Sequence, residues 1–168
     1  MEAHRGLVTS LLDGGLYPVV LALYGETTPL GSLSELGDEL SMRLCQWALE
    51  QGEYSLAAHL AAQIDKLPEG LTETRWELQV ARLEIFAGNS KTGSDRLLRL
   101  LHQSEEMKER QLDQLLQVAF DLQAISEHDL ALAVFKAAGP FARTVRQRRE
   151  LFFWMGESQI GKGQFAQA

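Results

Sequence analysis

The chain has few of the residues that build a covalent or metal-bound framework. It contains one cysteine, Cys45, and four histidines among 168 residues. A single cysteine excludes an internal disulfide and any zinc site built on several cysteines of this chain. The histidines are scattered and include no pair four residues apart, the spacing that places two metal ligands on one helix face. We therefore expect no metal site and no cofactor.

Long apolar runs and an excess of positive charge are absent too. The most apolar early run, LYPVVLALY, is nine residues long and contains Pro18, whereas a helix needs about 20 apolar residues to span a bilayer. The first residues, MEAHRGLVTSLLDGG, lack the basic start and apolar core of a signal peptide. The net charge of -7 repels a phosphate backbone overall. We expect no membrane insertion of this segment and no nucleic-acid partner.

Catalytic motifs are also missing. No glycine-rich phosphate loop is present, because GGL and GKG lack the preceding strand that such a loop requires. Cys45 falls at a small-residue packing position and is interpreted as a buried apolar side chain. Carboxylates such as Glu105, Glu106 and Glu109 are expected on a solvated helix surface. Since nothing assembles an acid, a base and a nucleophile, we predict that the chain is not an enzyme.

What the chain does contain is an internal repeat. Short breaks recur at LLDGGLYPVV, LEQGEYSLAA, IFAGNSKTGS, QAISEHDLAL and QIGKGQFAQA. The residues taken as equivalent are Gly15, Gly52, Gly88, Ser126 and Gly163, with spacings of 37, 36, 38 and 37 residues. Five residues after each comes a mostly small residue, in the series Val20, Ala57, Gly93, Ala131 and Ala168. A constant period of this length is typical of a helical repeat array.

The residues between the breaks favour helices. Apolar residues recur three or four positions apart, as in Leu115, Val118, Ala119 and Leu122, and no segment alternates strictly as a strand would. Ser32 with Glu35 and Thr74 with Glu77 fit the S/T-x-x-E capping box that begins a helix. The prediction is an all-α fold of antiparallel helix hairpins.

This layout resembles the tetratricopeptide repeat (TPR), a helix-turn-helix unit of 34 residues, over essentially the whole chain. The small residue that the family has at its eighth position corresponds to the series Val8, Cys45, Ala81, Ala119 and Gly156. The series from Val20 to Ala168 corresponds to the small twentieth position, where two helices cross closely. The resemblance implies an α-solenoid superhelix, and Sel1-like, pentatricopeptide and HEAT arrays remain alternatives because they share its physics.

The predicted array is a single domain, residues 1–168, with units of about 1–37, 38–73, 74–111, 112–148 and 149–168. The fifth unit stops where its second helix is expected to start. We therefore expect this chain to be a piece of a longer array.

The resemblance also implies a binding groove lined by the first helix of each unit. Mapping the family's groove positions predicts an apolar stripe along this groove. The alternative is that a neighbouring segment closes the groove, so that the same residues belong to the core. Its residues are Met42, Leu49, Leu78, Ile85, Leu116, Phe120 and Phe153. Arg75 and Arg82 lie on one helical face and are candidates to bind an acidic side chain or a C-terminal carboxylate.

The segment RTVRQRRE contains Arg143, Arg146, Arg148 and Arg149. We expect it to be a solvated turn before the last helix, with an acidic partner or RNA as the alternative ligand.

The function predicted from these residues is a non-catalytic protein-interaction scaffold that binds a peptide or helix of a protein partner. One alternative is a structural spacer that self-associates through its repeat ends, because solenoids normally require polar caps. A weaker alternative is an RNA-binding helical repeat.

Overall fold

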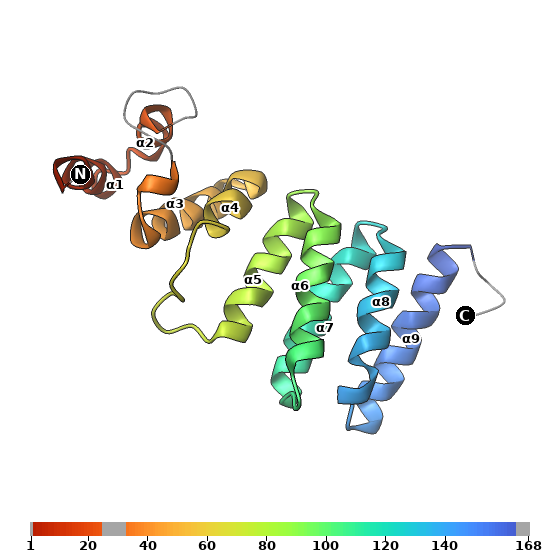
Figure 1. The fold of residues 1–168 in the computed structure, drawn as a ribbon. Coiled ribbons are helices and arrows are strands. Elements are labelled where there is room, and N and C mark those ends of the chain that lie inside the picture. Colours follow the sequence, from red (N-terminus) through yellow and green to blue (C-terminus); the bar gives the residue numbers. More distant parts are fainter. Residues whose placement is uncertain (1, 25–32, 164–168) are drawn as a thin grey trace. The chain divides into compact units, whose positions relative to one another are not determined.

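The structure, a computed structural model, describes residues 2–24 and 33–163 (Figure 1). Within these ranges it contains α-helices and short 3-10 helices and no strand, so the predicted all-α fold class is confirmed. The chain divides into two compact units, residues 1–70 and residues 71–168. The division falls near the end of the second predicted repeat.

The N-terminal unit consists of two helix hairpins. Its elements are α1 (Glu2–Asp13), α2 (Tyr17–Leu23), η1 (Leu33–Glu35), α3 (Asp38–Gln51) and α4 (Tyr54–Ala61). Tyr17 stacks on Trp47 with the ring centroids 5.4 Å apart. Arg43 Nη2 lies 2.8 Å from Asp13 Oδ1. Both contacts join the first hairpin to the second.

The C-terminal unit consists of two helix hairpins and a further helix. Its elements are α5 (Glu73–Phe86), α6 (Ser90–Gln103), α7 (Glu109–Ala124), α8 (His128–Ala138), η2 (Gly139–Phe141) and α9 (Val145–Gly161). Within each hairpin, α5 packs on α6 and α7 on α8. Between hairpins, α5 contacts α7, and α6 contacts α8. First helices thus form one layer and second helices another, as in an α-solenoid.

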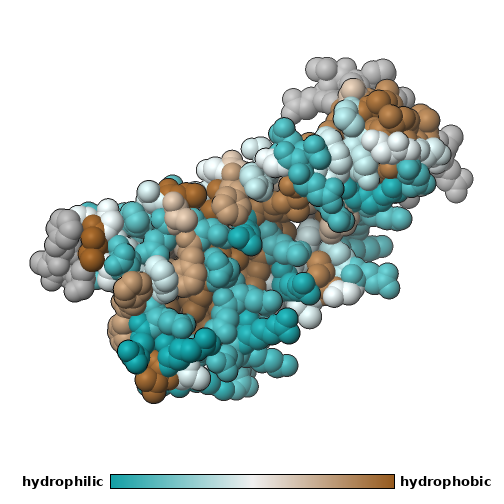
Figure 2. Space-filling model, turned by 180° about the vertical axis from the view of Figure 1, so that it is seen from behind, coloured by the Kyte–Doolittle hydropathy of each residue, from teal (hydrophilic) through white to brown (hydrophobic). Residues whose placement is uncertain are grey.

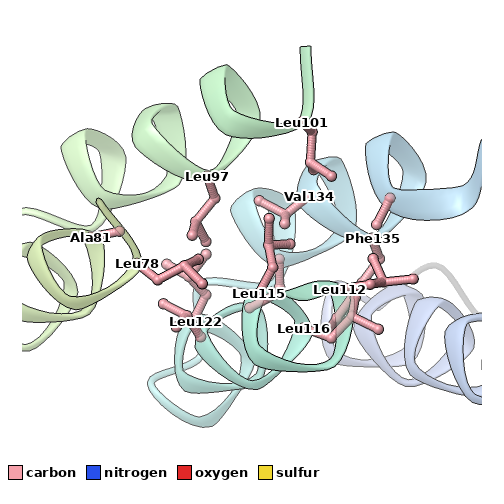
Figure 3. Packing of buried hydrophobic residues seen from close by; sticks show 14 of the residues in the cluster. Leu78, Ala81, Leu97, Leu101, Leu112, Leu115, Leu116, Leu122, Val134 and Phe135 are labelled. Carbon is pink, nitrogen blue, oxygen red and sulfur yellow. The ribbon is translucent and has the colours of Figure 1, made fainter. Parts of the chain in front are cut away.

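A continuous apolar core joins the helices of the C-terminal unit (Figure 3). Leu97 of α6 points towards Leu78 of α5, and Leu122 of α7 lies beside Leu78. Further along the unit, Leu112 of α7 meets Phe135 of α8, and both side chains are fully buried. The core is therefore shared by consecutive hairpins, and each hairpin buries its apolar residues against its neighbour.

The five predicted anchors share one backbone conformation. Gly15, Gly52, Gly88, Ser126 and Gly163 all have positive φ, between 67° and 87°. Ser126 is the only residue other than glycine with positive φ in the described ranges. A left-handed residue just after a helix lets the next amides bind the helix's last carbonyls.

The same pair of hydrogen bonds follows four of these helices. The N–H of Glu53 donates to the Ala48 carbonyl at 2.8 Å, and that of Glu127 donates to the Leu122 carbonyl at 2.9 Å. The anchors themselves donate to the carbonyl three residues earlier, as Ser126 does to Gln123 at 3.0 Å. The turn chemistry of the hairpins is thus repeated even where serine replaces glycine.

Small residues mark the points where paired helices approach closely. A Cβ added to Gly93 would lie 2.6 Å from the Ala81 carbonyl oxygen and 2.6 Å from Ile85 Cγ1. One hairpin earlier, Cys45 Sγ lies 3.4 Å from the Ala57 carbonyl oxygen. All described members of these two small-residue series are buried except Gly156, which is half-buried. Ala168 lies outside the described residues.

Two helix starts differ from the predictions. The side chain that caps α5 is Thr72, whose Oγ1 accepts a hydrogen bond from the Arg75 N–H at 3.3 Å, so the Thr74 cap was wrong by one half-turn. Glu35 lies in η1, and α3 begins only at Asp38. Ser32, the other half of that predicted box, lies outside the described residues.

Candidate functional site

The predicted groove residues of the N-terminal unit lie on α3. Met42 is half-buried and Leu49 is exposed. This unit therefore has one apolar side chain of the predicted stripe at its surface.

Three of the predicted groove residues are core residues of the C-terminal unit. Leu78, Ile85 and Leu116 expose only 5%, 1% and 4% of their surface. They are buried because α5 packs on both α6 and α7, with Ile85 next to Gly93 of α6, so these positions face neighbouring helices. The stripe is therefore not an open groove at Leu78, Ile85 and Leu116, and the core alternative holds for them.

The remaining apolar groove residues meet in an aromatic cluster. The ring centroids of Phe120 on α7 and Trp154 on α9 lie 4.7 Å apart. The ring centroid of Phe153 lies 4.9 Å from that of Trp154, in an edge-on arrangement. Phe120 also contacts Phe135 in the core at 5.5 Å. Trp154 thus connects Phe120 and Phe153, although it was missing from the predicted stripe. The run Phe-Phe-Trp was the only signal for it.

The two predicted acid-binding arginines have different environments. Arg82 Nε lies 2.8 Å from Asp121 Oδ2 on α7, and its guanidinium lies over the Phe86 ring at 5.6 Å. Burial raises the pKa of the Asp121 carboxyl, while the charge of Arg82 acts in the opposite direction. Arg75 is exposed. Arg82 therefore already forms an ion pair with an acidic side chain of the same unit.

The arginine-rich segment is helical from Val145 onwards, so the expected turn is limited to Arg143 and Thr144, whereas the expected exposure holds for all four arginines. Thr144 caps α9, and Arg146, Arg148 and Arg149 lie in its first two turns. Arg143 pairs with Glu106 at 2.7 Å, and the Arg148 Nε donates to the Ala142 carbonyl. Arg146 lies between 3.5 and 3.9 Å from three carboxylates, those of Glu109, Asp113 and Glu150.

A buried glutamine fixes the start of α9. Gln147 Oε1 accepts hydrogen bonds from the N–H groups of Arg143 and Thr144, and the Gln147 N–H donates to Thr144 Oγ1 at 3.1 Å. Its Nε2 lies 3.5 Å from Asp113 Oδ1 of α7. Near the other end of the helix, Gln123 Nε2 donates to Ser158 Oγ at 3.1 Å. These bonds anchor one face of α9 on α7.

The opposite face of α9 is apolar and exposed. Val145, Phe152, Phe153 and Ile160 expose 74%, 72%, 59% and 43% of their surface. Together with Arg149 and Gly156 they follow one another at intervals of one to four residues along a single helical face. We call these six residues the α9 outer face. Figure 2 shows apolar side chains among hydrophilic ones on this part of the unit.

A shallow depression runs along one flank of the α9 outer face. It has a volume of about 500 Å³ and is lined by Val145, Arg146, Arg149, Glu150, Phe153 and Trp154. Its walls combine aromatic rings with both signs of charge. Such a lining suits a side chain of another polypeptide that has an apolar body and a polar end.

Three further observations concern metal ligands, membrane spans and the single thiol. The described residues contain no cluster of three or more His, Cys, Asp or Glu side chains placed to hold a metal ion. No helix in residues 2–24 and 33–163 is both long enough and apolar enough to cross a membrane. Burial raises the pKa of the Cys45 thiol to about 11, which opposes formation of the reactive thiolate.

Comparisons with known proteins leave the family open. No protein-family model, curated protein or solved structure matches the chain. The TPR resemblance therefore remains a prediction that rests on the spacing and packing of the hairpins.

Proposed function

We propose that this chain is a protein-binding module built from TPR-like helix hairpins and that the α9 outer face is its binding surface. The observation that carries the proposal is the pair of apolar faces on α9. One face holds Leu151, which is buried in the core, and the other holds Val145, Phe152 and Phe153, which are exposed. A helix that is apolar on both sides is normally covered on both sides.

The chemistry of the surface suits a helix of another polypeptide. Its apolar residues recur along about 22 Å of helix, from Val145 to Ile160, a length that matches four turns of a partner helix. Helices that dock on such surfaces present apolar side chains at intervals of three and four residues. Gly156 lies in the middle of the face, where the lack of a side chain favours a close approach of the partner backbone.

The charge of the surface adds a preference. Arg149 lies within the α9 outer face and has no ion-pair partner among the described residues. A partner helix with a carboxylate opposite this position gains a charge-assisted hydrogen bond, whereas a basic residue there is repelled. We therefore propose an amphipathic helix with an acidic residue beside its apolar stripe as the ligand.

A protein ligand is favoured over RNA because most arginines of the segment already have partners within the unit. Arg143 and Arg146 have carboxylates beside them, and Arg148 donates to a backbone carbonyl. Phosphate groups would have to compete with those contacts, and the net charge of -7 opposes them further.

The proposal is tested by comparing proteins captured by wild-type and Phe152→Glu baits after cross-linking. Phe152 is largely exposed, so the glutamate disturbs the binding surface without entering the core. Leu67→Glu, at an exposed residue of the connection before α5, is the matched control with the same change of charge. We expect one or more proteins to be lost from the Phe152→Glu sample and retained by Leu67→Glu. Equal capture by all three baits contradicts the proposal.

A further inference from the structure

Resting on the proposed function, we infer that the partner of the α9 outer face is the same face of a second copy of this chain, with the two α9 helices antiparallel. The first argument is the order of residues along the face. Measured from the midpoint between Phe152 and Phe153, Arg149 and Gly156 are equally distant, and so are Val145 and Ile160.

This symmetry is the requirement for a two-fold contact. In an antiparallel pair related by a two-fold axis, each residue lies opposite the one at the same distance on the other side of the midpoint. Phe152 and Phe153 then lie level with the same two phenylalanines of the second copy, and Val145 lies level with its Ile160. Each large apolar side chain thus has an apolar partner, and the arginine, the longest side chain, lies opposite the glycine.

Charge supports the same pairing. The arginines of α9 are at residues 146, 148 and 149, in its N-terminal half, and Glu157 is in its C-terminal half. Antiparallel packing places the Arg149 of one copy within about one residue's rise of the Glu157 of the other. Neither Arg149 nor Glu157 has an ion pair within the described residues. Parallel packing would instead bring the arginines of the two copies together.

The contact of two such helices is small for a protein interface. Interfaces at the low end of the range bury less than about 1,200 Å² and are weak, so we expect a dissociation constant in the micromolar range. The experiment is sedimentation velocity on the full chain between about 1 and 200 µM, which covers such affinities. We expect a concentration-dependent dimer for the wild-type chain. Phe152→Glu should stay monomeric and Leu67→Glu should dimerise.

Charge reversal tests the register of the contact. Arg149→Glu places two glutamates opposite each other at both ends of the dimer, and Glu157→Arg places two arginines there. Each variant alone is expected to be largely monomeric at concentrations where the wild-type chain is dimeric. An equimolar mixture of the two is expected to dimerise, because both contacts then regain opposite charges. Arg99→Glu, at an exposed residue of α6, changes the charge equally and should dimerise as the wild type does.

Three results would overturn the inference. A wild-type chain that stays monomeric up to about 200 µM excludes a micromolar dimer. A dimer that persists in both charge-reversal variants, or one that their mixture fails to restore, excludes the antiparallel α9 contact. The proposed function fails separately: if the chain is monomeric but Phe152→Glu still loses a captured protein, the binding surface stands and only its assignment to a second copy falls.

Discussion

Replacing Gly93 by alanine tests the close backbone contact between α5 and α6. In the interior of an exposed helix, this substitution stabilises a protein by up to about 1 kcal/mol, since alanine has the higher helix propensity. Here the added Cβ would lie 2.6 Å from both the Ala81 carbonyl oxygen and Ile85 Cγ1. Because ordinary contacts begin near 3.4 Å, α6 would have to move away from α5 by roughly 0.8 Å.

The expected sign is therefore the reverse of the propensity. Overpacking in a core costs about 1–3 kcal/mol, and a backbone oxygen yields less easily than a side chain, so we take about 3 kcal/mol. After the gain in propensity, Gly93→Ala should lower the free energy of unfolding by about 2 kcal/mol. Gly6→Ala is the control for helix propensity alone, because Gly6 lies inside α1 and its Cβ would meet nothing within 4 Å.

Urea unfolding followed by circular dichroism and by the fluorescence of Trp47, Trp76 and Trp154 measures both variants. Trp47 lies in the N-terminal unit, and Trp76 and Trp154 lie in the C-terminal unit. We expect Gly6→Ala to be as stable as the wild type or slightly more stable. If Gly93→Ala is equally stable, α5 and α6 do not approach as closely as described, and the role of the small-residue series is refuted.

Three further predictions concern the turns, the cysteine and the last helix. Ser126→Gly should stabilise the chain by about 1 kcal/mol in urea unfolding and Gly88→Ser should destabilise it similarly, since both residues have left-handed φ. The Cys45 thiol, with its pKa raised from 9.0 to about 11, should react with a disulfide reagent much more slowly in the folded than in the urea-unfolded chain. Above pH 9 the unfolded thiol ionises while the folded one keeps its proton, so the Cys45 contribution to stability should fall as the pH rises towards 11, and Cys45→Ala should remove that part of the pH dependence. Gln147→Ala should lower the free energy of unfolding by about 1–2 kcal/mol and speed hydrogen exchange in the first turn of α9. The substitution removes the hydrogen bonds of the Gln147 side chain with the N–H groups of Arg143 and Thr144 and its contact with Asp113. Unchanged exchange would contradict the capping role.

The hairpins could be predicted from the sequence because their determinants are local. A left-handed residue after a helix favours glycine, so the anchors at Gly52 and Gly88 were visible in the sequence. Ser126 could be found only by its spacing, since a serine by itself does not predict positive φ. Gly93 and Ala57 were recognisable as close-packing positions for the same reason, namely a fixed distance from each anchor.

The binding surface was harder to predict because it depends on contacts between helices. Whether Leu78 and Leu116 line an open groove or enter the core is decided by how closely α5 and α7 pack, and a periodic apolar pattern is the same in both cases. Phe153 of the predicted stripe lies at the surface, but Val145 and Phe152, which share the α9 outer face with it, were missed. The cap at Thr72 was missed because two threonines compete within three residues.

The packing of each helix mainly against its immediate neighbours also bears on how the chain forms during synthesis. In the C-terminal unit, the main contacts of α5 are with α6 and α7, and those of α8 are with helices no more than two positions away. Among the described residues, the main contacts of the helices are thus short in sequence separation, so contact order is low and folding is expected to be fast. Each hairpin can therefore acquire its core as the following one leaves the ribosome, which limits the time that Leu78 or Leu97 spends exposed to other chains.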